Sequence, residues 1–342
     1  MASGGLASEG SPTSGSGRIV LVTGATGFVG SHIAEALLRA GWSVRCTVRP
    51  TSDTRWLEHM RCERVTARVE RAAEVDAAVT GAVAVVHAAG LTRARSPREY
   101  RRVNVEGTEH ITEAAVRAGV RRLVLVSSLA ARGPDAGAEE TGSAAAPSSA
   151  YGRSKLDGER RVADRISGTG TEAVILRPGG VFGPRDTDLL PLFRMARYGW
   201  VPVPAGAGPV QPVFVTDVAT AAARALEADA PGIGPYPVAG AEVVTWETVA
   251  EGLGHGVGRP VRAVRLPAVL FETAGAGAEA VARLLARTPA FDRRRARDLA
   301  RLRWTCRIDA TERALGWRPA VGLADGLART GEWYRERGWL KR

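Results

Sequence analysis

The chain has 342 residues, 45% of them hydrophobic, which is enough for one large or two closely joined globular domains with a buried core. Its formal charge of +11 comes almost entirely from arginine, because lysine occurs only at Lys155 and Lys341. Apart from a cluster at 293–303, the arginines are spread along the whole chain, so the composition argues against a nucleic-acid-binding protein.

Nothing in the sequence indicates export, membrane insertion or metal binding. Residues 1–17 are rich in Gly and Ser and lack a hydrophobic stretch, which predicts a disordered tail and neither a signal peptide nor a membrane span. Cys46, Cys62 and Cys306 form no CxxC pair and no cluster with the five histidines. We therefore expect no metal site, no structural disulfide and a reducing, cytoplasmic location.

A glycine-rich loop stands between the first predicted strand and the first predicted helix, in the stretch RIVLVTGATGFVG at 18–30. Residues 19–22 predict a buried strand, and the apolar residues of 31–39 have helical spacing. This order places free backbone N–H groups and the positive end of a helix dipole where a dinucleotide pyrophosphate binds. The residues expected to bind the cofactor here are Gly24, Thr26, Gly27, Phe28, Val29 and Gly30.

The second predicted strand, 43–48, ends at Arg49, where an NAD-preferring enzyme usually has an acid for the ribose hydroxyls. An arginine suits the 2′-phosphate of NADP through its charge and its forked geometry. The sequence therefore favours NADP(H). Asp53 lies close enough to Arg49 to keep NAD(H) as the alternative.

Further buried strands at 83–86, 123–126 and 173–176 alternate with helices at 99–118 and 151–166. This alternation predicts a Rossmann-type α/β fold with a parallel, doubly wound sheet. The small residues Ala88, Ala89 and Gly90 follow one strand and let the chain pass close beneath a cofactor. We interpret the neighbouring His87 as a structural hydrogen-bonding residue.

The alternation of strands and helices becomes less regular after Gly179. A helix is predicted at 189–198 and irregular chain at 201–212, before a strand at 213–215, a helix at 217–228 and a strand at 236–239. No sheet-building alternation is evident from 243 onward. The sequence thus predicts a dinucleotide-binding domain over 18–180 plus about 212–242. A smaller, discontinuous substrate-binding domain takes about 181–211 plus 243–342.

The stretch Tyr151-Gly-Arg-Ser-Lys155 places a phenol and an ammonium on one face of a helix. A tyrosine with a pKa of about 10 is a poor base at neutral pH, and a cation one turn away lowers that pKa. Ser128 ends the preceding strand, so its hydroxyl is expected to hold a substrate oxygen near the tyrosine. Ser127 is the alternative for this role.

The motifs TGATGFVG, HAAG, VNVEGT, LVSSLA, YGRSK, LRPGGVFGPRD, VFVTDVA and ALGWRP occur in this order. Together they resemble the extended short-chain dehydrogenase/reductases. The resemblance implies that Tyr151 is the acid/base, that Lys155 also binds the nicotinamide ribose, and that Asn104 helps to shape the site. It implies cofactor contacts at Tyr151, Lys155 and Pro178. It also implies a homodimer formed through the helices 99–118 and 151–166.

Three departures from the family pattern argue against a sugar-nucleotide substrate. Glycine stands where such members have an asparagine in the stretch 177–181, and Gln211 stands near the position of their diphosphate-binding arginine. The serine strand also lacks the acid of sugar 4,6-dehydratases. The remaining features resemble the branch of 3β-hydroxysteroid dehydrogenases and dihydroflavonol reductases. The apolar segment 266–286 is too interrupted by charges to span a bilayer, but fits a lid over an apolar substrate or packing within the smaller domain.

The leading hypothesis is an NADP(H)-preferring oxidoreductase that interconverts a secondary alcohol and a ketone on an apolar small molecule. The alternatives are a nucleotide-diphosphate-sugar epimerase with retained NAD and, more remotely, a non-catalytic nucleotide-sensing regulator on the same fold.

Overall fold

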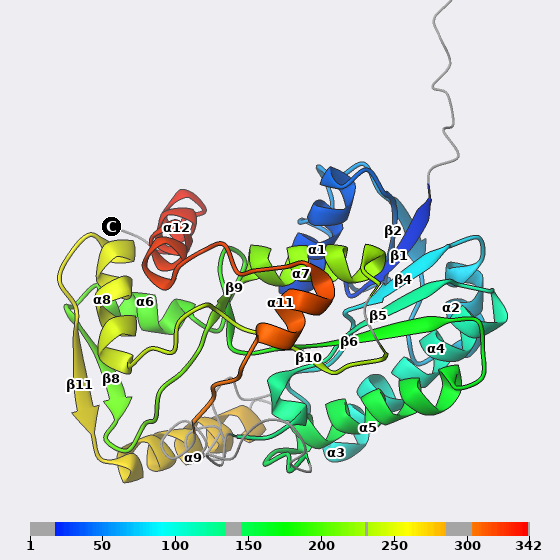
Figure 1. Cartoon of the computed structure of the whole chain (residues 1–342). Helices are drawn as coiled ribbons and strands as arrows, with labels where there is room; N and C mark the ends of the chain where they lie inside the picture. Colours follow the sequence, from blue (N-terminus) through cyan, green and yellow to red (C-terminus); the bar gives the residue numbers. More distant parts are fainter. Residues whose placement is uncertain (1–17, 135–144, 230–231, 285–302, 341–342) are drawn as a thin grey trace, which may run out of the picture.

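A seven-stranded parallel sheet forms the core of the larger half of the computed structural model, on the right in Figure 1. The structure describes residues 18–134, 145–229, 232–284 and 303–340. The strand order is β10-β6-β5-β4-β1-β2-β3. The strands are β1 (Ile19–Thr23), β2 (Ser43–Val48), β3 (Glu63–Thr66), β4 (Ala84–His87), β5 (Arg122–Val126), β6 (Glu172–Pro178) and β10 (Tyr236–Val238). The order reverses between β1 and β4, and in open α/β sheets ligands bind outside the carboxyl ends of the strands at such a point.

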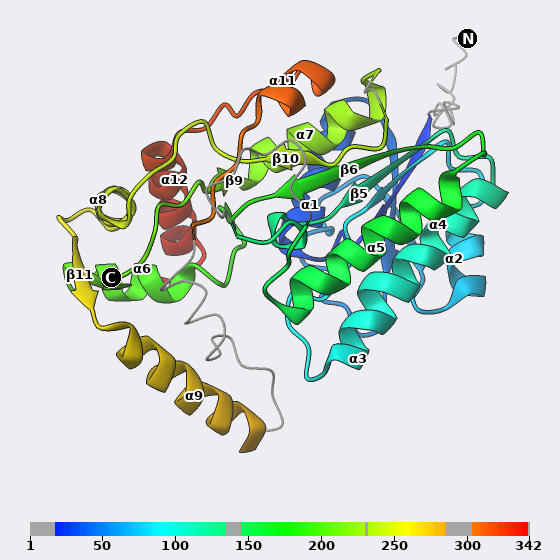
Figure 2. The same ribbon diagram turned by 60° about the horizontal axis from the view of Figure 1, so that its bottom comes forward.

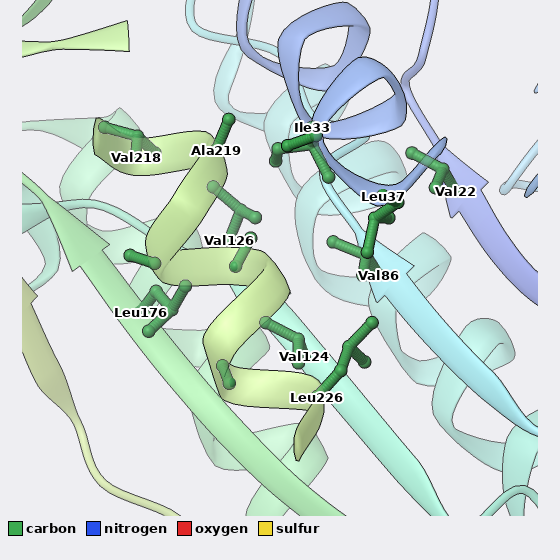
Figure 3. Packing of buried hydrophobic residues seen from close by; sticks show 14 of the residues in the cluster. Val22, Ile33, Leu37, Val86, Val124, Val126, Leu176, Val218, Ala219 and Leu226 are labelled. Carbon is green, nitrogen blue, oxygen red and sulfur yellow. The ribbon is translucent and has the colours of Figure 1, made fainter. Parts of the chain in front are cut away.

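Helices cover both faces of the sheet, as the doubly wound prediction requires. On one face α1 (Phe28–Arg39) and α7 (Val215–Glu227) pack against alternate strand residues. Figure 3 shows this packing: Leu37 of α1 lies near Val86, and α7 lies over Val124, Val126 and Leu176. Because successive strand residues point to opposite faces, Leu21 joins the other core while Val20 and Val22 join this one.

On the opposite face α2 (Ala72–Val79), α4 (Gly107–Arg117) and α5 (Ala150–Ile166) lie side by side (Figure 2). The segment expected to be one helix at 99–118 is α3 (Pro97–Tyr100), a π-helical stretch (Arg101–Glu106) and α4 in succession. A π-helix widens the turn and re-aims a side chain, and this stretch contains Asn104.

A second set of elements forms a separate core. It consists of α6 (Leu190–Ala196), β8 (Trp200–Pro204), α8 (Trp246–Val257), β11 (Arg262–Leu266) and α12 (Leu323–Glu336), with α9 (Ala268–Leu284) following β11. β7 (Val181–Phe182) pairs with β9 (Val213–Phe214) at the junction. One late helix, α11 (Asp309–Leu315), instead packs on the core of α1 and α7 through Leu315. The exact domain boundaries stay a prediction.

Several sequence expectations about this second part were wrong. The stretch 201–212 was expected to be irregular and the chain from 243 to lack strands, yet β8 and β11 pair in parallel. Among the described residues this sheet has two strands, so each strand has a neighbour on one side and tolerates Pro202 and Pro204, which lack a backbone N–H. These prolines hide the strand in the sequence pattern. In the dinucleotide-binding part, β3 and α2 were not predicted. For β3 the reason is that it is a short, exposed edge strand.

The expected tail at 1–17 and all of the basic cluster 293–303 except Arg303 lie outside the described residues. The apolar segment 266–286 forms α9 over most of its length. Within the described ranges, no helix is both long and apolar enough to cross a membrane, and no group of His, Cys, Asp or Glu is arranged to hold a metal ion. The three cysteines are all free.

Candidate active site

The glycine loop after β1 is built so that only glycine fits at two positions. Gly24 has a φ of +73°, and a Cβ there would lie 2.6 Å from the backbone N of Ala89. A Cβ at Gly30 would lie 2.2 Å from the Gly24 carbonyl oxygen. The chain is therefore pressed tightly between β1, the loop after β4 and α1.

This loop ends at the N-terminus of α1, whose N-cap is Gly27 and whose first turn contains Phe28, Val29 and no acid. The first intrahelical bond at this end is donated by the Ser31 N–H to the Gly27 carbonyl. The earlier amides of the turn have no intrahelical acceptor, and the helix dipole favours an anion there. Together with Thr26 just before the cap, these residues fit a pyrophosphate group.

Three hydrogen bonds hold the loop after β4 in place beside the glycine loop. The Ala89 N–H donates to Thr23 Oγ1 at 3.2 Å, and Thr23 Oγ1 also bonds His87 Nδ1 at 2.6 Å. His87 Nε2 bonds Thr108 Oγ1 at 3.0 Å, and burial lowers the pKa of His87 to about 3. His87 is therefore a neutral hydrogen-bonding residue, which agrees with its structural interpretation. Ala88 and Ala89 come directly after β4, at the carboxyl end of the sheet where the strand order reverses.

Asn104 joins this loop to helix α5. Its Oδ1 accepts from the Leu91 N–H at 2.7 Å, and its Nδ2 donates to the Leu91 carbonyl at 3.0 Å and to Ser154 Oγ at 2.9 Å. A Cβ at Gly90 would lie 3.2 Å from Asn104 Oδ1 and 3.7 Å from Lys155 Nζ. Asn104 thus positions Gly90 beside Lys155, while its own polar atoms are occupied by protein partners.

Arg49 lies exposed at the carboxyl end of β2, next to β1 in the sheet. In the described part of the chain, its guanidinium pairs with no carboxylate. Asp53, the residue that left NAD open, accepts from Arg55 Nε at 2.5 Å and from the Arg55 N–H at 3.0 Å. Arg55 therefore engages the competing acid, and Arg49 lies at the carboxyl end of the sheet, the edge at which open α/β sheets bind ligands.

The Tyr151–Lys155 pair lies in the first turns of α5, after Ser149 caps the helix by accepting from the Gly152 N–H. Lys155 is buried and its Nζ donates to the Val126 carbonyl at 2.8 Å. Burial lowers the pKa of Lys155 to about 8, and the negative charge of Glu159 opposes that shift. An ammonium has three donors, so two remain for the tyrosine side and a ribose.

Of the two candidate serines, Ser128 is the one that faces a cavity, whereas Ser127 is buried. Ser128 caps the short helix Leu129–Ala131, accepting from the Ala130 N–H at 3.2 Å. A Cβ at Gly152 would lie 2.2 Å from the Ala130 carbonyl oxygen, so this short helix packs directly on the turn of α5 that carries Tyr151. Ser128, Tyr151 and Lys155 therefore come from two elements in close contact.

Sequence reasoning missed a buried ion pair beside these residues. Arg177 Nε donates to Glu159 Oε1 at 2.9 Å, and Ser127 Oγ donates to the same carboxylate. Both charged side chains are almost completely buried. The available signal was an acid four residues after Lys155, on the same helical face. The cluster holds the carboxyl ends of β5 and β6 against α5, which fixes both Ser128 and the Val126 carbonyl.

The cavity at Ser128 has a volume of about 420 Å³ and lies between the carboxyl edge of the sheet and the smaller core. Its lining is mainly apolar and includes Pro178, Val181, Phe182, Leu189, Leu192, Val210, Trp246, Val249, Trp304, Leu323 and Leu327. Gln211 also lines it, but its Nε2 donates to the Gly240 carbonyl and its Oε1 accepts from the Cys306 N–H, both at 2.8 Å. A larger hollow of about 800 Å³ beside the outer end of α1 contains none of the predicted catalytic residues.

Asp186 is a buried acid in the wall of the cavity at Ser128, and burial raises its pKa to about 7 from 3.8. A folded-state pKa above the unfolded one means that the folded protein is stabilised while Asp186 is protonated and loses this contribution as the pH rises through 7. We expect the free energy of unfolding to fall by about 2 kcal/mol more in wild type than in Asp186→Asn between about pH 5 and pH 8. Urea denaturation at both pH values measures it; parallel pH profiles would contradict it.

The fold and site define a class: an α/β dinucleotide-binding enzyme with a tyrosine–lysine pair. Comparison with known proteins is more specific. The model of the NAD dependent epimerase/dehydratase family matches residues 20–238. A ceramide reductase from Caulobacter vibrioides is 33% identical over 94% of this chain and 96% of its own length. The chain belongs to the NAD-dependent epimerase/dehydratase family and is an NAD(P)-dependent oxidoreductase of the extended short-chain type.

Two further comparisons agree. A mouse 3 beta-hydroxysteroid dehydrogenase type 7 is 35% identical over 187 residues, which cover 48% of this chain and 50% of that enzyme. The crystal structure of gox2253 superimposes with a TM-score of 0.77 and 27% identity, covering 95% of this chain and all of that one. The predicted family and fold are therefore confirmed.

Proposed function

We propose that the protein is an NADP(H)-preferring oxidoreductase that interconverts a ketone and a secondary alcohol on an apolar lipid of the ceramide type. The observation that carries this proposal is the lining of the cavity at Ser128, which is mainly apolar and, among the described residues, includes no arginine for a diphosphate. The similarity over nearly the whole length of a ceramide reductase supports the same class of substrate.

When bound, a nicotinamide cofactor would supply the hydride for the carbonyl carbon in the reductive direction. Ser128 Oγ donates a hydrogen bond to the carbonyl oxygen and holds it toward α5. The Tyr151 hydroxyl transfers its proton to that oxygen as the alcohol forms. The buried Lys155 ammonium stabilises the phenolate left on Tyr151 and holds the nicotinamide ribose. In the oxidative direction Tyr151 removes the proton instead.

The sugar-nucleotide epimerase remains the second candidate, because the family includes such enzymes. It would use the same tyrosine with an NAD that stays bound. The engagement of Gln211 with Gly240 and Cys306 argues against a diphosphate at that wall. The presence of both Tyr151 and Lys155 argues against a non-catalytic nucleotide sensor.

The nucleotide released on denaturing freshly purified protein separates these candidates. We expect a site that is largely empty as purified and that oxidises added NADPH when given a long-chain ketone. Near-stoichiometric NAD in the released fraction, with no turnover of apolar ketones, would favour the epimerase and overturn the proposal.

Replacing Arg49 with alanine tests the cofactor preference. We expect the Kd for NADPH to rise about tenfold or more, because the 2′-phosphate loses its cation, while the Kd for NADH changes little. Titration of nucleotide fluorescence measures both constants. An equal change for the two nucleotides would show that Arg49 does not read the 2′-phosphate.

A further inference from the structure

We propose that the outer surface of the smaller half, formed by β8, β11 and the start of α9, docks on an anionic lipid bilayer. Its use, delivery of a lipid to the cavity, rests on the proposed function.

Large exposed hydrophobic side chains gather on this surface. Seven such side chains are strongly exposed in the described part of the chain, and five of them lie in these elements or directly before β8. They are Tyr198, Trp200, Val264, Val269 and Leu270, with Tyr198 75%, Val269 61% and Leu270 50% exposed. Exposed apolar side chains that gather in neighbouring elements are typical of an interaction site.

The register of the two strands explains why these residues share a face. Trp200 lies opposite Arg262, and Pro202 lies opposite Val264. The intervening Val201 and Val203 are buried, and Val201 belongs to the core shared with α6 and α8, so Trp200 and Val264 are on the opposite, outer side. The inner side of this small sheet thus supports α8, which carries Trp246 and Val249 of the cavity wall, while Trp200 and Val264 are exposed on its outer side.

Helix α9 extends this face. It follows β11 after Pro267, and Figure 2 shows it projecting away from the smaller half. Val269, Leu270 and Thr273 are exposed in its first turns, and the acid there, Glu272, is half-buried. Exposed apolar side chains in the first turns of a helix are of the kind that bury at the interface between headgroups and acyl chains.

The charge of the surface selects an anionic bilayer as the occupant. Arg262 is exposed and lies opposite Trp200 on the neighbouring strand. Arg259 lies near the start of β8, where its guanidinium donates to the Arg197 carbonyl at 2.8 Å. Neither arginine pairs with a carboxylate within the described ranges, whereas the nearby Glu247 is neutralised by Arg265. Tryptophan and tyrosine settle at headgroup depth, and arginines are attracted to anionic lipid.

Vesicle sedimentation tests the proposal with the full chain and without substrate or nucleotide. We expect binding to vesicles of phosphatidylcholine with phosphatidylglycerol and much weaker binding to phosphatidylcholine alone. The double variant Val269→Gln/Leu270→Gln should weaken binding by about tenfold or more, and Arg262→Gln by about fivefold. Val83→Gln is the matched control, because Val83 is 43% exposed at the start of β4, in the nucleotide-binding half.

Thermal unfolding checks that each variant is folded. Absence of binding by wild type, equal binding to both vesicle types, or unchanged binding by the folded double variant would overturn the proposal. Self-association in gel filtration that the double variant abolishes, without vesicle binding, would identify a second copy as the occupant and also overturn it. Because no turnover is measured, failure of the proposed enzymatic reaction leaves this result independent.

Discussion

Tyr151→Phe is expected to lower kcat by about 10²–10⁴-fold, the usual contribution of a positioned general acid. The substitution removes only the hydroxyl, so the ring still packs beside Tyr100, whose ring centroid lies 6.1 Å away. Nucleotide affinity should therefore remain within about twofold of wild type. Initial rates of NADPH oxidation with an apolar ketone and nucleotide titrations measure the two effects separately.

Lys155→Met provides the contrast, because Lys155 is proposed to act on both the proton and the ribose. It should lose turnover to a similar extent and also bind nucleotide less tightly. Tyr100→Phe is the control on the neighbouring ring and should change turnover little. Retained turnover in Tyr151→Phe would remove the phenol from the mechanism, whatever the behaviour of Lys155→Met.

The part of the fold that could be predicted from sequence is the part fixed by local patterns. Residues 20–22, the apolar positions of the helix that follows and the apolar stretches at 84–86 and 123–126 are buried in the sheet or its helices. Their burial on both faces makes them hydrophobic without interruption, so the signal is strong. β11 gave no such signal, because only one side of it is covered and the residues Arg262, Val264 and Arg265 are exposed.

The candidate site likewise has features that the sequence predicts and features that only the tertiary structure shows. Glycines with unusual backbone geometry and the Tyr151–Lys155 spacing are visible in sequence, because each is a local requirement. The choice between Ser127 and Ser128 depends on which hydroxyl meets Glu159, a residue 32 positions from Ser127, and so required the tertiary structure. The apolar lining of the cavity likewise joins Phe182, Trp246, Trp304 and Leu327 from distant segments.

Removing the Glu159 carboxylate should have the largest effect on stability. Glu159→Ala leaves the buried Arg177 guanidinium without its counter-ion and Ser127 Oγ without its acceptor. Loss of one partner from a buried ion pair costs about 3–5 kcal/mol. Denaturant unfolding measures the loss, and the double variant Glu159→Leu/Arg177→Met should regain much of it. A loss below about 1 kcal/mol would indicate a solvated pair.

Glu159→Gln separates the charge from the hydrogen bonds, because an amide oxygen still accepts from Ser127. The Glu159 charge raises the pKa of Lys155, which burial has lowered to about 8. Without that charge the pKa falls further, so Lys155 loses its proton at lower pH and ceases to stabilise the Tyr151 phenolate. The alkaline limb of kcat/KM should therefore move to lower pH in Glu159→Gln. A merely structural role for Glu159 would lower the rate at every pH and leave the limb in place, because only a charge acting on Lys155 displaces its titration.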